Sequence, residues 1–301
     1  MTARNLLWPL LLLAAALPAF TARAETGTNS KLSWEVGAKA SGVGKSEFKG
    51  WSREGDAELL ETSFSAVASL ESGSGLVYRF GFEMQRSDFG SVRSIPLPDS
   101  LQSYGLVIGA DAQLGDAWLA RLEIRPGFYG GGDGDGDVFR FGSLNVPVVL
   151  GASYFVNSDL QFVLGVSLNF NRKYPVLPGV GVRWRMGRSW VLNGILPTPR
   201  IEYSLSPDLT LYVGGDFRSE TFRMSRGYGR SLGSTRLDNA VADHTEIRVG
   251  AGVAWNINTT TTFQMEAGVV PVHDVDYHRA DLRMHSSELP PYLDISLKTK
   301  F

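Results

Sequence analysis

The chain of 301 residues carries 29 basic and 31 acidic side chains, no cysteine, and a formal net charge of −2. This balance, without any basic cluster, argues against a nucleic-acid partner. Because there is no cysteine, no disulfide can staple a small exported scaffold, so stability must come from a packed core or from a closed hydrogen-bonded sheet.

The first 24 residues predict an export signal. One basic residue, Arg4, precedes the apolar run of 6–16, and Ala22 and Ala24 place small residues where a signal peptidase reads. The run is too short for a membrane-spanning helix, which needs about 20 apolar residues. We therefore predict a signal peptide over 1–24, cleaved after Ala24, and an outer-membrane domain over 25–301. No later stretch predicts a transmembrane helix, so a membrane location requires strands.

Beyond the signal, apolar and polar side chains alternate at every second position. In 76–85, for example, Tyr78, Phe80 and Phe82 share one face, and Arg79 and Glu83 share the other. A strand between lipid and water needs this period of two. The same period recurs in eleven further segments: 32–40, 64–70, 106–114, 118–125, 146–154, 162–170, 180–186, 201–205, 209–213, 247–255 and 263–269.

These segments predict an all-β protein, a transmembrane up-and-down antiparallel β-barrel of 12–14 strands. The count stays open because Leu196-Pro197-Thr198-Pro199 separates two short apolar runs that could be an irregular pair. The connections alternate in length, as in outer-membrane barrels. The short ones are 71–75, 115–116, 157–159, 187–189, 206–208 and 256–260, and the long polar ones, expected as outer loops, are 41–57, 87–103, 129–137, 171–179, 219–244 and 271–290.

Aromatic residues and the C-terminal segment support the same fold. Large rings gather near the short connections, where they would rest at the level of the lipid headgroups. They are Trp118, Tyr154, Phe162, Trp190, Tyr203, Trp255 and Phe263. The last segment, 293–301, alternates and stops on Phe301. It is similar to the terminal strand of bacterial outer-membrane proteins, which implies recognition by the barrel-assembly machinery and contact with outer-membrane lipids.

A wider resemblance rests on Pro147-Val148-Val149-Leu150-Gly151, on Pro178-Gly179-Val180-Gly181, and on the Leu196-Pro197-Thr198-Pro199 turn before 201–205. With the Tyr292-to-Phe301 ending, the chain resembles a family of uncharacterised bacterial outer-membrane β-barrels, known as a domain of unknown function. The resemblance implies fold and location for most of the mature chain. It implies no activity, because the family has no assigned catalytic residues.

The inward positions carry charged pairs that must be paired or hydrated. The candidate constriction residues are Arg79, Glu83, Arg121, Glu123, Arg125, Arg183, Arg185, Glu202 and Arg248. They could form a rigid salt-bridge network, or an ion-selecting constriction in which the arginines of 121–125 and 183–185 favour anions if they face open water. Many inward glycines and serines leave room for water or for a folded-in loop. A porin-like channel for small solutes, open or plugged, is the leading functional hypothesis.

Two stretches could hold a metal ion. Asp133, Asp135 and Asp137 alternate with glycine and could bind calcium, although a hydrated hairpin tip is the alternative. His273 and His278 lie among carboxylates in a stretch whose spacing matches no tight zinc pattern, and a solvated loop is the alternative. We predict no cofactor and no enzyme, because no serine has a nucleophile context. Two alternatives remain open: an interaction barrel that uses the loops 219–244 and 271–290, and a lipid-modifying enzyme that uses His273, His278 and His285.

Overall fold

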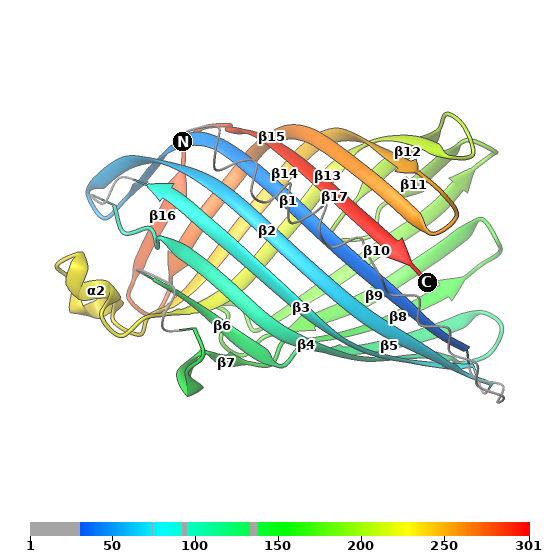
Figure 1. The fold of residues 1–301 in the computed structure, drawn as a ribbon, viewed down its shortest axis with the longest axis horizontal. Helices are drawn as coiled ribbons and strands as arrows, with labels where there is room; N and C mark the ends of the chain where they lie inside the picture. Colours follow the sequence, from blue (N-terminus) through cyan, green and yellow to red (C-terminus); the bar gives the residue numbers. More distant parts are fainter. Residues whose placement is uncertain (1–30, 74, 92–94, 133–137) are drawn as a thin grey trace.

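The described residues form one closed antiparallel β-barrel of 14 strands, as predicted from the alternation (Figure 1). The structure is a computed structural model and describes residues 31–301 except 74, 92–94 and 133–137. The predicted signal peptide and the aspartates at 133, 135 and 137 lie outside the described residues. The strand count is the upper limit of the prediction, because the two short runs around the prolyl turn both join the sheet.

Eleven of the strands are continuous: β1 (Lys31–Gly50), β2 (Arg53–Ser72), β3 (Leu76–Ser91), β4 (Ser100–Gln113), β9 (Leu160–Leu168), β10 (Val176–Met186), β11 (Trp190–Asn193), β12 (Arg200–Ser204), β13 (Leu209–Met224), β14 (Val241–Asn256) and β15 (Thr261–Tyr277). The helical turns are η1 (Phe141–Ser143), α2 (Tyr228–Ser231) and η2 (Thr235–Leu237). No helix in the described ranges has the length and apolar character to cross a membrane.

The other three strands are interrupted: β5 (Trp118–Ile124) continues as β6 (Gly127–Gly132), β7 (Leu144–Asn145) as β8 (Val148–Phe155), and β16 (Leu282–Ser286) as β17 (Pro291–Lys300). Pro126 and Pro147 lie in the first two breaks, because proline has no N–H to donate to the ladder. Their carbonyl oxygens still accept. The N–H of Leu106 donates to Pro126 and that of Arg125 to Pro147, each at 2.9 Å.

The C-terminal strand closes the barrel. β17 pairs with β1 from Glu35 opposite Lys300 to Val43 opposite Tyr292. The N–H of Phe301 donates to the carbonyl of Trp34 at 2.8 Å. The sheet therefore has no unpaired edge here, which removes a template for aggregation.

The two ends of the barrel differ. All six predicted short connections lie at one end, which also holds the C-terminus and is on the right in Figure 1. We call it the short-turn end, and the opposite end, with α2, the loop end. The expected long loop over 41–57 is wrong: β1 and β2 run on to a tight turn at Trp51 and Ser52, both with positive φ. Their extra length encloses buried Phe48 and Leu59.

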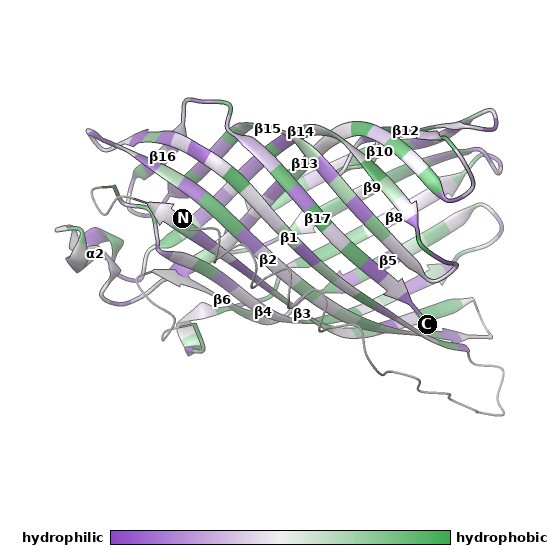
Figure 2. Ribbon diagram, turned by 45° about the horizontal axis from the view of Figure 1, so that its top comes forward, coloured by the Kyte–Doolittle hydropathy of each residue, from purple (hydrophilic) through white to green (hydrophobic). Residues whose placement is uncertain are grey.

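The outer face of the wall is apolar and the inner face polar, so colours alternate along each strand in Figure 2. On β14 the outward apolar side chains run from Ile247 to Trp255, and Thr245 and Asp243 follow toward the loop end. The predicted aromatic positions come together near the short turns. Trp118 packs on Tyr154 at 4.9 Å between ring centroids, and Trp190 packs on Tyr203 at 4.7 Å.

Candidate functional site

The lumen is closed at the loop end by apolar side chains. Ile95 and Leu97, from the connection between β3 and β4, point inward and are 1% and 3% exposed. The hydroxyl of Tyr277 donates to the carbonyl of Pro96 at 2.9 Å and lies 2.8 Å from the hydroxyl of Tyr228, the first residue of α2. We call these residues, with the facing strand residues, the loop-end plug; its other apolar members include Phe48, Leu101, Leu237, Val275 and Met284.

At the loop end, a contact beyond the ends of the short strands β11 and β12 completes this closure. β11 and β12 have only four and five residues, so the upper part of β13 extends beyond them. There Arg223 and Met224 of β13 pair in parallel with Gly130 and Gly131 of β6. Two strands that are distant in the sheet order therefore meet at the loop end and narrow its mouth.

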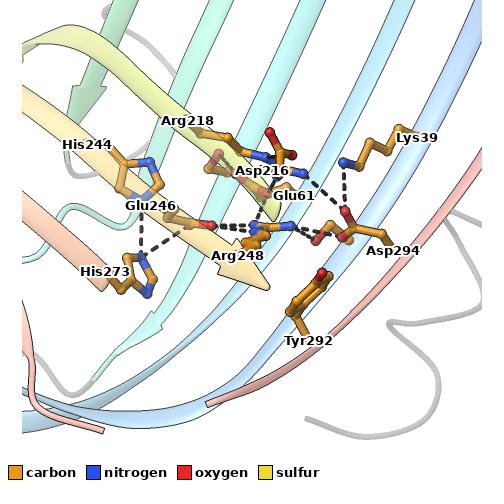
Figure 3. Close-up of polar contacts among 12 residues, drawn as sticks. Lys39, Glu61, Asp216, Arg218, His244, Glu246, Arg248, His273, Tyr292 and Asp294 are labelled. Atoms are coloured by element: carbon orange, nitrogen blue, oxygen red, sulfur yellow. Dashed lines mark hydrogen bonds and ion pairs between the residues drawn. The ribbon is translucent and has the colours of Figure 1, made fainter. Parts of the chain in front are cut away.

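Below the plug lies a layer of charged side chains around Arg248, drawn in Figure 3. The guanidinium of Arg248 is fully buried and donates to Glu246 at 2.7 Å, to Asp294 at 2.9 Å, to Ser41 at 2.6 Å and also to Glu61. We call the whole group the Arg248 layer; its charged members are Lys39, Glu61, Asp216, Arg218, Glu246, Arg248 and Asp294.

Arg218 and Lys39 complete the pairing in this layer. Arg218 contacts Glu61 at 2.6 Å, Asp216 at 2.6 Å and Asp294 at 3.1 Å. Lys39 contacts Asp294 at 2.7 Å. The strands β1, β2, β13, β14 and β17 all contribute, so the layer links five of the 14 strands across the lumen. The shared carboxylates offset the cost of burying the arginines, as buried charges require.

A second network holds most of the predicted constriction residues. Arg79 contacts Asp111 at 3.3 Å and Glu123 at 2.8 Å, and Arg121 contacts Asp111 at 2.8 Å. Arg125 contacts Glu123 at 2.6 Å. These arginines, on β3, on β5 and directly after β5, therefore have carboxylate partners from the same wall, which is the salt-bridge arrangement that the sequence left open.

The remaining predicted charges are distributed differently. Glu83 joins the second network through Arg125, at 3.6 Å. Arg183 and Arg185 lie exposed toward the short-turn end, where Arg185 is 3.7 Å from Asp159. Glu202, on β12, is half-buried opposite Tyr212. The nine predicted residues thus fall into separate places rather than one ring.

Two of the four histidines are buried within strands, although they fall in the ranges 219–244 and 271–290 that the sequence predicts as loops. His244 on β14 and His273 on β15 point into the lumen and are 6% and 2% exposed. Phe48 packs on the ring of His273 at 4.8 Å, and Phe89 packs on that of His244 at 5.5 Å. The loop expectation failed because β14 and β15 extend beyond the apolar band into the region expected to be loop.

His278 and His285 lie apart from this pair. The Nδ1 of His278 is 3.5 Å from Asp243, and His285 is exposed on β16. The predicted set of His273 and His278 is therefore not brought together by any contact among the described residues. His244 and Glu246 take that place beside His273, and neither was a sequence candidate for a metal.

Two titratable groups lie beyond the apolar bands of their strands, which end at Phe217 on β13 and at Val272 on β15. Burial raises the pKa of Glu220 to about 7, with the nearby Glu61 adding to the effect. Burial lowers the pKa of His273 to about 4, so its imidazole is neutral at ordinary pH. Glu220 lies opposite His244 in the pairing of β13 with β14.

A polar cavity of about 100 Å³ lies on the short-turn side of the Arg248 layer. It is lined by Lys39, Asp216, Asp294, Thr198, Arg200, Tyr212, Gly215, Gln264, Glu266 and Ser296. Thr198 belongs to the prolyl turn, which reaches β13 through hydrogen bonds from Gly215 and Phe217 to the proline carbonyls, each at 2.8 Å.

The sequence missed Glu61 and Glu220 as site residues. Counting alternate positions back from 64–70 places Glu61 inward, and counting forward from 209–213 places Glu220 inward.

No family model matches the chain, and no curated protein matches it. The comparison with solved structures finds similarity at low sequence identity. An outer membrane channel from Pseudomonas putida F1 is 11% identical, with 93% of this chain and 100% of that chain covered and a TM-score of 0.47. The Pseudomonas putida toluene transporter TodX is 9% identical, with 90% of each chain covered and a TM-score of 0.46.

The translocator domain of the autotransporter NalP from Neisseria meningitidis is 12% identical, with 99% of this chain and 96% of that chain covered and a TM-score of 0.39. At these identities and TM-scores the likenesses show neither a family nor an activity. The site is therefore interpreted from its own residues.

Proposed function

We propose that this chain is an outer-membrane β-barrel of porin-like type, through which small solutes pass when the loop-end plug opens. The location rests on the closed sheet, whose strands pair on both sides across the described residues, and on its apolar outer face. The aromatic pairs near the short turns fit a membrane interface. In this orientation the short turns face the periplasm and the loop end faces outward.

The observation that carries the channel proposal is a row of glycines along the inner wall. Gly151, Gly165 and Gly179 lie side by side in the pairing of β8, β9 and β10. By strand order this row lies across the barrel from the Arg248 layer. A barrel of this size is wider than side chains alone fill, so a wall without side chains leaves space for a polar path.

The plug closes this path at the loop end and is the proposed gate. Its inserted residues, Ile95 and Leu97, come from a connection between strands, so they can leave the lumen without breaking the barrel ladder. The Arg248 layer, in contrast, is built from the strands themselves and holds the wall in shape. Opening therefore requires movement of the loop end only.

Planar-bilayer recording with the purified full chain tests the proposal. We expect the wild type to be mostly closed with brief openings, and the double variant Ile95→Ser/Leu97→Ser to be open for a larger fraction of time. Leu289→Ser, at an exposed loop position, is the matched control and should behave as the wild type. If neither the wild type nor the double variant conducts, although both fold by heat-modifiable gel migration, the channel proposal fails and the barrel fold stands.

A further inference from the structure

Three ligand-type atoms converge between the plug and the Arg248 layer, and no part of the proposed gating uses them. The Nε2 atoms of His244 and His273 are 3.1 Å apart. The Oε1 of Glu246 lies 3.2 Å from the first and 3.4 Å from the second. Figure 3 shows both imidazoles and this carboxylate turned toward one point. The three residues form the only group in the described ranges with the composition and spacing of a metal site.

The triangle has the dimensions of a tetrahedral metal face. Zinc binds imidazole nitrogen at about 2.0–2.1 Å and carboxylate oxygen at about 2.0–2.2 Å, so two ligand atoms at tetrahedral angles lie roughly 3.3–3.5 Å apart. The observed edges are 3.1, 3.2 and 3.4 Å. An ion slightly above the plane of the three atoms would reach all of them with little movement of the side chains.

Hydrogen bonding alone leaves this cluster unsatisfied. Glu246 is 1% exposed, and its Oε2 is held by Arg248, whereas its Oε1 makes no well-formed hydrogen bond although both imidazole Nε2 atoms lie within 3.4 Å of it. A buried carboxylate oxygen without a well-formed hydrogen bond is costly, and an ion bound to it would remove that cost. The fixed Oε2 also orients the carboxylate, as groups around a metal ligand commonly do.

The charge of the surroundings favours a cation. In the Arg248 layer together with Glu220, carboxylates outnumber basic groups by five to three: Glu61, Asp216, Glu220, Glu246 and Asp294 against Lys39, Arg218 and Arg248. Glu220 faces His244 across the β13–β14 pair, and its Oε2 is buried without a partner. It is placed to contact an ion or a water molecule on the open side of the triangle.

We propose that His244, His273 and Glu246 bind a divalent transition-metal ion of the zinc type at the floor of the loop-end plug. Two imidazoles and one carboxylate leave a fourth position, which Glu220 or water would fill. Imidazole favours zinc, copper, iron and nickel over magnesium and calcium, so the site selects against the hard divalent ions. None of its three ligands belongs to the aspartate-rich segment at 133–137.

Metal content after refolding tests the proposal. The full chain is refolded into detergent with Zn²⁺, washed with a weak chelator, and analysed for zinc per folded chain. We expect about one zinc per chain for the wild type, and at least a fivefold loss for His244→Gln/His273→Gln. His285→Gln, at the exposed histidine of β16, is the matched control and should keep the wild-type content. Heat-modifiable gel migration reports that each variant is folded.

A second measurement needs no variant. Refolding with Co²⁺ in place of Zn²⁺ should give the intense visible absorption of a four-coordinate site, absent when excess Zn²⁺ is present. The proposal is overturned if the folded wild type shows no such absorption and retains no more zinc than the double variant, or if His285→Gln loses as much as the double variant. Neither measurement depends on conductance, so this result is independent of the channel proposal.

Discussion

Replacing Arg248 by methionine would leave buried carboxylates of the Arg248 layer without their arginine partner. Methionine keeps much of the side-chain length and can still pack on the ring of Tyr292, over which the guanidinium now lies at 5.4 Å. It removes the hydrogen bonds that Arg248 itself donates to Glu246, Glu61 and Asp294. The variant therefore isolates the charge and its hydrogen bonds from the packing contribution.

The expected loss can be worked from the remaining contacts. Glu61 and Asp294 keep Arg218, at 2.6 and 3.1 Å, and Asp294 also keeps Lys39. Glu246 loses its only arginine and keeps the two imidazoles. The cost is then mainly that of one buried carboxylate, Glu246, without its arginine. We expect a loss of about 3–5 kcal/mol in the free energy of unfolding. Adding Glu246→Gln removes the unpaired negative charge, so the double variant should recover more than half of this loss.

Urea unfolding in lipid vesicles, followed by heat-modifiable gel migration, measures both variants. Lys45→Met is the control, because the Lys45–Asp56 pair is exposed and such pairs contribute little; we expect no measurable change. A loss below about 1 kcal/mol for Arg248→Met, or a double variant no more stable than the single one, would refute the account of the layer as a mutually dependent charge network.

Three further predictions test other parts of the structure in the same unfolding assay. The pKa of Glu220 is raised from 4.5 to about 7 in the folded protein. Protonated Glu220 therefore contributes stability that is fully present below pH 4.5 and is lost as the pH rises through 7. The difference in unfolding free energy between pH 5 and pH 8 should shrink in Glu220→Gln, and an unchanged difference would contradict this. A β-carbon at Gly250 would lie 2.5 Å from a backbone oxygen of β15, so Gly250→Ala should lower the free energy of unfolding by about 1–3 kcal/mol. Gly42 has open space around it, so Gly42→Ala should leave stability unchanged. Equal effects of the two substitutions would exclude the close approach at Gly250. Leu164 faces outward at 56% exposure, so Leu164→Arg should lower the free energy of unfolding by about 2–4 kcal/mol. Val163→Arg, on the lumen face, should lower it less. The reverse order would show that the membrane-facing side is misassigned.

The closed barrel could be predicted from local patterning because the lipid-facing wall imposes a period of two on every strand. That constraint acts on each residue separately, so 76–85 already distinguishes Phe80 from Arg79 without any partner strand. The terminal strand followed from the same rule, and its pairing with β1 confirms it. The end of the apolar band, however, looked like the end of the strand. Beyond the band the outer face turns polar while the strand continues, so the local pattern predicts a loop over 41–57 where the structure has strands.

The sequence by itself determined that the chain forms strands, which face of each is apolar, and that the short connections gather at one end, because these properties depend on neighbours along the chain. Only the tertiary structure decided which charges meet. Arg248 reaches Glu61 from a strand 187 positions away, and Glu246 meets His273 across a β-bulge that shifts the register between Ile247 and Val249. Barrel closure and register set these contacts, and a change of one residue in register would turn every lumen side chain of that strand toward lipid.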